Sequence, residues 1–504
     1  MYCLRFMNNN NNSSQVVIIA HTPEPERLCA SAASISTTKG TALEVYQQQQ
    51  DLAKAQKLIK NVLRLGHATT IEHACFTIAF ENVSAFVEQF MIEFRLASFT
   101  IKSRRYVDFS QMGYYQPEFR FREEVTEKHK QQINKLYNTH IKKLFSEYDY
   151  LMQNGVPRED ARFLLPYCYR SNFYCTVNAR ELQHIIHVAL EGRGRKYPEI
   201  KAIGVGLWEQ AKKIAPGIFE FALEENGDDK EERLRKLLAE GSFPEGVLQK
   251  RELRQERKKE TSSRSFCELL SYTENPEKLV AAAVLIKHTL CSSETAQEIL
   301  EENQALGDRL LELACEDQRK RELEQVCFTF RINNLTLAGL THLARHRLQS
   351  LNVPSFTEFG LSREYVLPDS IVEKPDLLTR YLETWQEHQK LFSGFKKAGV
   401  IKEDLVYLYL SGNLVDVVTT MNGRELFHFF RLRTCTRAQW EIRALAVEML
   451  KQLRKIAPAL FKRFGPSCYV WDKCPEGKLS CGQKDEVVRR YTEAEELDPE
   501  KGKE

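Results

Sequence analysis

Residues 16–33 read VVIIAHTPEPERLCASAA, and residues 266–283 read FCELLSYTENPEKLVAAA. Both stretches have a strand-like apolar opening, then a turn with the pattern T-x-x-P-E, then the start of an alanine-rich helix. The offset of about 250 residues is the size of a whole domain rather than of a solenoid unit. The chain is therefore predicted to contain two copies of one domain.

Further matches between the two copies recur in the same order along the chain. They are HACFT at 73–77 with QVCFT at 325–329, EFRLASFTIKS at 93–103 with RHRLQSLNVPS at 345–355, VNARELQHI at 177–185 with MNGRELFHF at 421–429, and KIAPGIF at 213–219 with KIAPALF at 455–461. Each copy runs from a strand through helices to short strands, such as FTIAFEN and FTFRINN, and then to long helices. This order predicts an α+β fold in which helix dominates.

The charged stretch between the copies is poor in aromatic residues and bounded by Gly, Pro and Ser, which is typical of a linker. The predicted organisation is a disordered leader at 1–15 with an asparagine run, a first copy at 16–225, a linker at 226–264, a second copy at 265–482 and a polar tail at 483–504.

Composition excludes several broad classes of protein. The 504 residues carry 72 basic and 69 acidic side chains, so the net charge of +3 gives no overall field for nucleic acid, and we expect no nucleic-acid partner. No run of 18 apolar residues and no secretory signal occur, so we expect a cytoplasmic protein without a membrane partner. The 13 scattered Cys fit reduced thiols better than a disulfide framework.

Three basic residues, Arg345, His346 and Arg347, stand together where an apolar helix ends. The stretch TLAGLTHLA before them has helical spacing, and Pro354 prevents much continuation beyond them. Two arginine forks match phosphate oxygens, so one interpretation is a phosphate site. The alternative is a solvated basic helix end paired with nearby carboxylates.

A second basic set lies near the C-terminus of each copy. Arg424, His428 and Arg431 fall at i, i+4 and i+7 and share one helix face, whereas Arg433 projects elsewhere. The alternative to a ligand-binding face is a solvated basic face.

Two other groups are less informative. The neighbours Glu72 and His73 point apart on a helix or a strand, which favours capping or a ligand contact over acid–base catalysis. The spacing of Cys468, Cys474 and Cys481 lacks C-x2-C and has no obvious fourth ligand, so no metal site is predicted.

The RHR-x7-S pattern ending at Ser355, together with NGRELFHFFRLRTCTRAQWEIR at 422–443, resembles the flavin-dependent thymidylate synthase family (ThyX). The first copy is similar to the same family in the segments GHATTIEHACFTIAF at 66–80, SRRYVDF at 103–109, GVPREDARFLLP at 155–166 and TVNAREL at 176–182. The resemblance covers nearly all of the chain outside the leader and the linker.

This resemblance implies helices around a twisted antiparallel sheet in each copy, and a tetramer with active sites between subunits. It implies FAD as cofactor, dUMP as substrate, and methylenetetrahydrofolate and NADPH as co-substrates. In that chemistry reduced flavin supplies the hydride and no enzyme cysteine attacks the uracil.

The resemblance also implies residue roles. For dUMP they are Ser103, Arg105 and Arg162 in the first copy and His342, Arg345 and Arg433 in the second, with Arg433 on the pyrimidine as the catalytic residue. For FAD they are His67, Thr69, Asn178, Arg180 and His184 in the first copy and Arg345, His346, Arg347, Asn422, Arg424 and His428 in the second.

Each copy departs from the family pattern where the other keeps it. The first copy has Glu93, Phe94 and Arg95 in place of Arg-His-Arg, and Ala189 in place of Arg433. The second copy has Phe356, Thr357 and Glu358 after the motif serine, Val406 in place of Arg162, and Arg319 in place of His67. A carboxylate such as Glu93 repels phosphate, so neither copy alone holds a full set.

We therefore expect hybrid sites that combine residues of both copies, one per chain, in an assembly of two chains that imitates the four-subunit family. The acidic residue that the family carries two positions before the motif serine is replaced by Ile101 and Val353. That loss leaves two alternatives open: an inactive flavin- or nucleotide-binding scaffold, or a flavoenzyme that acts on another pyrimidine nucleotide.

Overall fold

The computed structural model describes residues 13–220, 233, 237, 265–357 and 365–493, and it divides into two compact units. Unit 1 contains residues 1–261 and 368–411, and unit 2 contains residues 262–367 and 412–504. The segment 368–411 belongs to the second copy in sequence but packs with the first copy. The bounds of the two copies, 16–225 and 265–482, remain a prediction. The predicted linker at 226–264 lies outside the described residues, except for residues 233 and 237.

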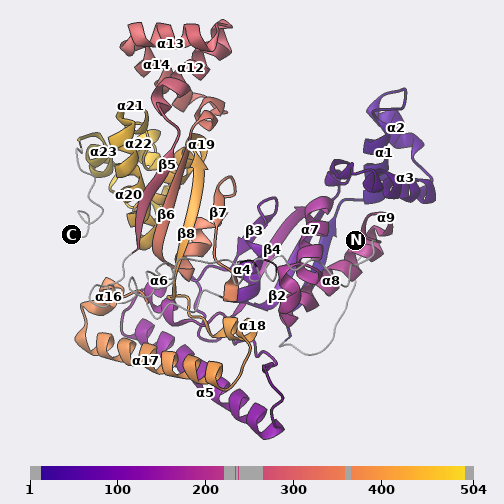
Figure 1. The fold of residues 1–504 in the computed structure, drawn as a ribbon, viewed down its shortest axis with the longest axis vertical. Helices are drawn as coiled ribbons and strands as arrows, with labels where there is room; N and C mark the ends of the chain where they lie inside the picture. The colour runs from indigo at the N-terminus through magenta and orange to yellow at the C-terminus, as the bar shows by residue number, and fades with distance from the viewer. Residues whose placement is uncertain (1–12, 221–232, 234–236, 238–264, 358–364, 494–504) are drawn as a thin grey trace. The chain divides into compact units, whose positions relative to one another are not determined.

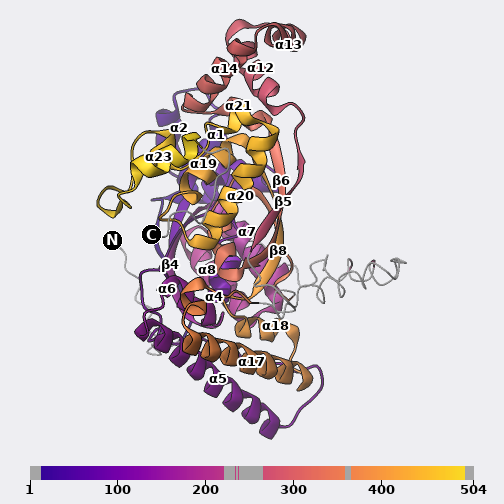
Figure 2. The same cartoon turned by 90° about the vertical axis from the view of Figure 1, so that its left-hand side faces the viewer.

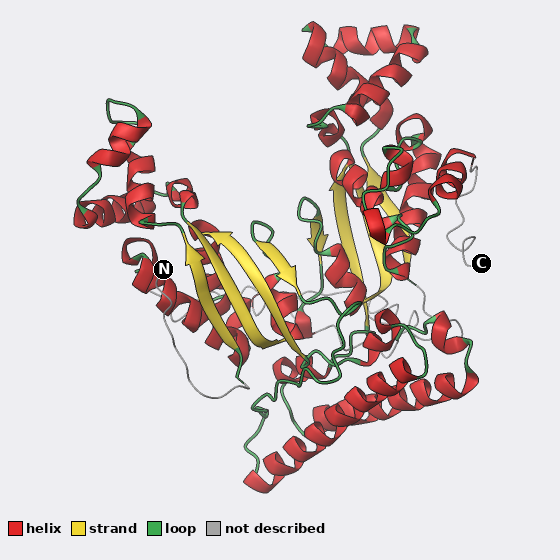
Figure 3. Ribbon diagram, turned by 180° about the vertical axis from the view of Figure 1, so that it is seen from behind, coloured by secondary structure: helices red, strands yellow, loops and turns green. Residues whose placement is uncertain are grey.

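Each unit contains a four-stranded antiparallel sheet (Figures 1 and 3). In unit 1 the strand order is β1-β2-β4-β3, with β1 (Gln15–His21), β2 (Cys75–Ser84), β3 (Ser98–Ile101) and β4 (Arg170–Asn178). In unit 2 it is β5-β6-β8-β7, with β5 (Phe266–Tyr272), β6 (Cys327–Thr336), β7 (Ser350–Asn352) and β8 (Leu414–Asn422). The predicted α+β class with two similar domains is confirmed.

The two sheets share their irregularities as well as their order. The first strand pair shifts register between Ile18 and Ala20 in unit 1 and between Leu269 and Ser271 in unit 2. Asn82 and Asn334 both adopt positive φ, 53° and 56°, where the second strand of each sheet shifts register. Asn tolerates this left-handed conformation better than most residues, so the same local chemistry produces the same kink twice.

The helices of unit 1 follow the strands in the predicted order. They are α1 (Pro25–Ser34), α2 (Ala42–Gln48), α3 (Leu52–Arg64), η1 (Ala68–His73), α4 (Ala85–Met91), α5 (Glu127–Gln153), α6 (Arg158–Ala161), η2 (Arg162–Leu164), α7 (Ala179–Leu190), η3 (Arg193–Lys196), α8 (Pro198–Ile214) and α9 (Pro216–Phe219), joined by α16 (Asp369–Val372), α17 (Pro375–Lys397), α18 (Lys402–Leu405) and η6 (Val406–Leu408) of the second copy.

The helices of unit 2 repeat much of this order. They are α12 (Pro276–Thr289), α13 (Ser293–Glu302), α14 (Gln304–Glu316), η4 (Arg321–Gln325), α15 (Leu337–Leu343), α19 (Gly423–Arg433), α20 (Trp440–Ile456), α21 (Pro458–Phe461), α22 (Ser467–Val470), η7 (Gly477–Leu479) and α23 (Lys484–Glu493). Helix α23 falls in the predicted polar tail, yet it buries Val487 and Tyr491, which share a face because they are four residues apart.

A buried carboxylate fastens the long C-terminal helix to the sheet in each unit. Glu199 of α8 accepts hydrogen bonds from the backbone and hydroxyl of Ser84, at 2.9 and 2.6 Å. Glu441 of α20 accepts the equivalent bonds from Thr336, at 2.8 and 2.5 Å. Because each carboxylate is buried, these bonds compensate for its lost hydration and fix where the helix begins relative to the sheet.

Helices α5 and α17 pack side by side in unit 1 (Figures 1 and 2). Lys374 donates to the carbonyl of Asn154 at 2.9 Å near one end, and Arg380 donates to Glu147 at 3.0 Å further along. Residue numbers rise along one helix as they fall along the other, so the pair is antiparallel. Among the residues described, no helix has both the length and the apolar character needed to cross a membrane.

Candidate functional site

The basic triplet of unit 2 lies just beyond helix α15, as predicted. The helix ends at Leu343, and the backbone N–H of His346 donates to the Leu343 carbonyl at 3.0 Å. Arg345 and Arg347 are exposed, whereas His346 between them is only 3% exposed. The two arginines therefore face solvent on either side of an imidazole that belongs to the core.

His346 connects two residues of helix α19. Its Nδ1 lies 3.0 Å from Oε1 of Glu425, and its Nε2 accepts a hydrogen bond from Nε of Arg433 at 2.9 Å. Arg433 also donates through Nη2 to the carbonyl of His342 at 3.3 Å. Burial and, to a lesser extent, the Arg433 charge lower the pKa of His346 to about 3, so the ring is neutral near pH 7.

Helix α19 begins at a side-chain cap that the two copies share. The Asn422 side chain accepts from the backbone N–H of Glu425 at 2.8 Å, and in the first copy Asn178 accepts from Glu181 at 2.9 Å. Asn is among the residues favoured at this position because its oxygen satisfies a backbone donor that the helix leaves without a partner. Both asparagines, predicted to contact FAD, therefore have a capping role.

The predicted FAD arginines of α7 and α19 are held alike. Arg424 donates to Glu324 at 2.5 Å, and Arg180 donates to Glu72 at 2.6 Å. Each carboxylate lies in the short helix before the second strand, and neither was predicted as a partner. Glu72 is thus an ion-pair partner of Arg180.

The remaining predicted FAD residues differ in their surroundings. His67, Thr69, His184 and His428 are exposed. His184 lies edge-on to the Phe94 ring, with centroids 5.5 Å apart. Arg431, predicted to share a face with Arg424 and His428, stacks over the Trp471 ring at 3.2 Å instead.

In unit 1, Glu159 brings Arg105 and Arg162 together with Ser103. Its carboxylate accepts from Nε of Arg105 at 2.8 Å, and its backbone carbonyl accepts from Nε of Arg162 at 3.0 Å. The backbone N–H of Arg105 donates to the Ser103 hydroxyl at 3.3 Å. Glu159 was not predicted, and its only sequence signal is an acidic position three residues before Arg162.

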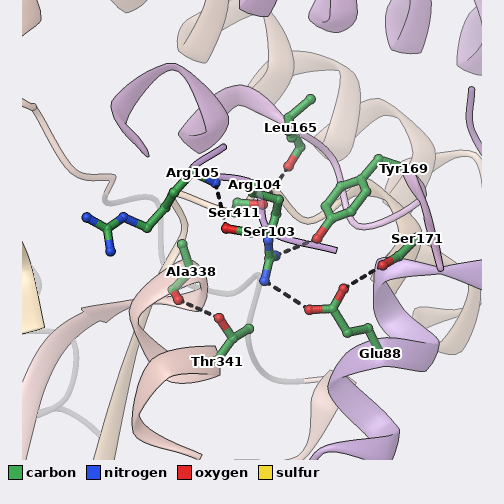
Figure 4. A network of polar contacts seen from close by, with 10 residues as sticks. All are labelled: Glu88, Ser103, Arg104, Arg105, Leu165, Tyr169, Ser171, Ala338, Thr341 and Ser411. Atoms are coloured by element: carbon green, nitrogen blue, oxygen red, sulfur yellow. Dashed lines mark hydrogen bonds and ion pairs between the residues drawn. The ribbon is translucent and has the colours of Figure 1, made fainter. Parts of the chain in front are cut away.

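Arg104, which lies between Ser103 and Arg105 in the chain, is buried and forms hydrogen bonds within the protein (Figure 4). It donates to Glu88 at 2.9 Å and to the Tyr169 hydroxyl at 2.5 Å, and Glu88 also accepts from Ser171 at 2.8 Å. Burial works to lower the pKa of Arg104, but the Glu88 charge and the contact with Tyr169 outweigh burial and raise that pKa. The buried pair anchors the residue between Ser103 and Arg105.

The positions that lost family residues have been repacked. In the first copy Glu93 forms a 2.5 Å ion pair with Arg193, and Phe94 and Ala189 are buried. In the second copy Phe356 and Val406 are buried. The substituted side chains are therefore either ion-paired or packed in the protein core.

The C-terminal cysteines singled out in the sequence do not form a recognisable metal site. Cys468 is buried, and Cys474 and Cys481 are partly exposed. Across the described part of the chain, no group of three or more His, Cys, Asp or Glu side chains is arranged to hold a metal ion.

Fold and site together define a duplicated α+β protein in which each copy carries part of the predicted set of basic residues. Comparison with known proteins gives the family. Residues 17–217 and 268–459 match the family described as "Thymidylate synthase complementing protein". The chain belongs to this family and is a tandem-duplicated member of it.

Two relatives in sequence agree with this assignment. The flavin-dependent thymidylate synthase of Clostridium tetani is 35% identical over 241 residues, which cover 44% of this chain and 95% of that protein. The flavin-dependent thymidylate synthase of Geobacter sulfurreducens is 34% identical over 232 residues, covering 45% and 97%. A crystal structure of the UMP/dUMP methylase PolB from Streptomyces cacaoi bound with 5-Br dUMP is more distant, with 21% identity, a TM-score of 0.35, and coverage of 42% and 94%.

Proposed function

We propose that this protein is an FAD-dependent thymidylate synthase that converts dUMP to dTMP by reductive methylation, with methylenetetrahydrofolate and NADPH as co-substrates. The observation that carries the proposal is the division of the basic residues. Arg345 and Arg433 have no arginine at the equivalent positions of the first copy, Glu93 and Ala189, and the cluster of Arg105 and Arg162 on Glu159 occurs only in the first copy.

The chemistry of the donor set fits FAD. Arg345 and Arg347 are exposed on a helix end, and two guanidinium groups suit the oxygens of a diphosphate. Arg180 and Arg424 lie on the first turns of α7 and α19, and each forms an ion pair with a glutamate of its own unit. They add cationic donors of the same kind. When bound and reduced, FAD supplies the hydride of the reaction.

The chain's own residues then have separate tasks on dUMP. Ser103, Arg105 and Arg162 hold the phosphate, because a hydroxyl and two guanidinium groups are clustered there. Arg433 keeps its positive charge beside a neutral imidazole and stabilises negative charge that develops on the pyrimidine. A complete set requires both copies, so we propose one hybrid site per chain in an assembly of two chains.

The test is to incubate the purified protein anaerobically with FAD, NADPH, methylenetetrahydrofolate and dUMP, and to measure dTMP by chromatography. We expect dTMP from the unaltered protein and a large loss with Arg433→Ala. Bound FAD without any dTMP would contradict the proposal and favour the scaffold. Methylation of UMP or dCMP but not of dUMP would indicate another pyrimidine substrate. Saturation with two FAD per chain would contradict the hybrid site.

A further inference from the structure

Glu425, His346 and Arg433 form a continuous chain of hydrogen bonds inside unit 2. Glu425 lies in the first turn of α19 and Arg433 ends the helix. They are eight positions apart, a rise of about 12 Å along the axis, so the two side chains are not neighbours on the helix surface. His346 spans the interval from outside the helix, with one ring nitrogen toward each residue.

The contacts fix which nitrogen of His346 carries its proton. The Nε group of Arg433 can only donate, so Nε2 of His346 must present its lone pair. The proton of the neutral ring is then on Nδ1, where Glu425 accepts it at 3.0 Å. Without Glu425 the proton could move to Nε2, where it would meet the N–H of Arg433.

This arrangement also preserves the charge of Arg433. A carboxylate placed directly against the guanidinium would cancel most of its field at a ligand. A neutral imidazole accepts the hydrogen bond without adding a negative charge, and the Glu425 carboxylate is one ring further away. The contact with His346 therefore orients Arg433 without placing a negative charge against its Nε.

The first copy shows what happens to the position of His346 when the arginine is absent. It keeps Glu181 at the position of Glu425 but has Ala189 at the position of Arg433. The position of His346 is then occupied by Phe94, which packs against His184. The histidine and the arginine are thus present together or absent together within one chain.

We infer that His346 and Glu425 are positioning residues for Arg433, and that His346 acts through this arginine rather than by direct contact with FAD. Both ring nitrogens are engaged within the protein and the side chain is 2% exposed, so no face of the ring is presented to a cofactor. The inference deepens the proposed function and rests on it for the ligand that Arg433 meets.

The test compares substitutions that keep or remove the relay. Gln at position 346 can accept from Arg433 and donate to Glu425, whereas Phe copies the first copy and can do neither. We expect His346→Gln to leave the Kd for dUMP within about threefold of the unaltered protein, and we expect His346→Phe and Arg433→Ala each to raise it by about tenfold or more. Glu425→Leu is expected to resemble His346→Phe, and Glu425→Gln to resemble His346→Gln.

The matched control is Glu181→Leu, which removes the equivalent carboxylate where no imidazole depends on it, and its Kd for dUMP should not change. Calorimetry of the FAD-loaded protein gives each Kd, and the Tm without dUMP shows whether a variant is folded. An unchanged Kd in folded His346→Phe would overturn the inference.

A second measurement is independent of activity. In protein labelled with 15N-histidine, the resonance that disappears in His346→Gln should have the pattern of a neutral ring with its proton on Nδ1 at pH 7. A proton on Nε2, or a charged ring, would overturn the inference whether or not the protein makes dTMP. Failure of the unaltered protein to bind dUMP, with the Nδ1–H pattern present, would count against the proposed function and not against the relay.

Discussion

Pro166 and Leu410 occupy equivalent positions in the two copies, and they form an antiparallel β-bridge with each other. On one side the N–H of Tyr167 donates to the carbonyl of Tyr409 at 2.7 Å, and on the other the N–H of Ser411 donates to the carbonyl of Leu165 at 2.9 Å. Each bond is the counterpart of the other, so the bridge has local twofold character. Equivalent segments of the two copies therefore pair with each other within one chain.

The first prediction concerns this exchange of segments. Because residues 368–411 pack with the first copy, cutting the chain between the copies should not separate them. A protease site inserted in the linker should, after cleavage, yield two fragments that elute together in gel filtration and separate only in denaturant. Separate elution under native conditions would contradict the packing.

The second prediction concerns a buried ion pair and its apolar counterpart. Arg104 and Glu88 are 5% and 1% exposed, and the second copy has Phe356 and Leu340 at the same positions. Removing one member leaves a buried charge alone, so Arg104→Phe or Glu88→Leu should each lower the free energy of unfolding by about 3–5 kcal/mol. Thermal unfolding measures the loss.

The double variant Glu88→Leu with Arg104→Phe reproduces the second copy's pair and is the control. It should recover most of the lost stability, because neither charge is then buried without its partner. Losses that simply add in the double variant would show that the two side chains do not interact.

The third prediction concerns pH. His140 and His388 are buried in the α5–α17 contact, with Nε2 of His140 3.0 Å from Nδ1 of His388. Burial lowers the pKa of His140 to about 4, and burial together with His140 lowers that of His388. Glu387 acts to raise the pKa of His140 and Lys143 to lower it, and both effects are smaller than that of burial.

Since the unfolded chain takes up protons near pH 6.5 and the folded pair does not, stability should be constant above pH 6.5 and fall as the pH drops from 6.5 toward 4. For His140 the loss amounts to about 3 kcal/mol. Urea unfolding at pH 7.5, 6 and 5 measures it. His140→Thr with His388→Leu introduces the residues found at the equivalent positions, Thr384 and Leu144, and should flatten the profile. An equally steep profile in this folded variant would exclude the pair as its source.

The fourth prediction concerns the division of the ligand set between the copies. Arg345→Ala and Arg105→Ala should each raise the Kd for dUMP by about tenfold to a hundredfold, because each removes a charged hydrogen-bond donor from the same site. Calorimetric titration of the FAD-loaded protein measures both. Arg95→Ala, in the first copy's altered motif, is the control and should have no effect. A large loss from only one of the first two variants would show that they do not share a site.

Local sequence patterns were sufficient for the duplication, the α+β class and the place of the basic triplet. Alternation and turn residues predicted β2 and β6, and the apolar spacing predicted a helix that ends before Arg345. These features depend on residues within a few positions of each other, and the two copies repeat the same local sequence patterns.

Partnerships between distant residues were decided only by tertiary structure. Glu159 lies 54 positions from Arg105, Glu425 lies 79 from His346, and Glu147 lies 233 from Arg380. Motif spacing showed that Arg105 and Arg433 were present, but not which side chains orient them. Likewise, nothing local to residues 368–411 indicates that they pack with the first copy rather than with their own. The sequence determines which side chains are present and which local helices and strands they form. Hydrogen-bond partners and burial are decided by the tertiary structure, because they depend on which distant segments pack together and exclude water.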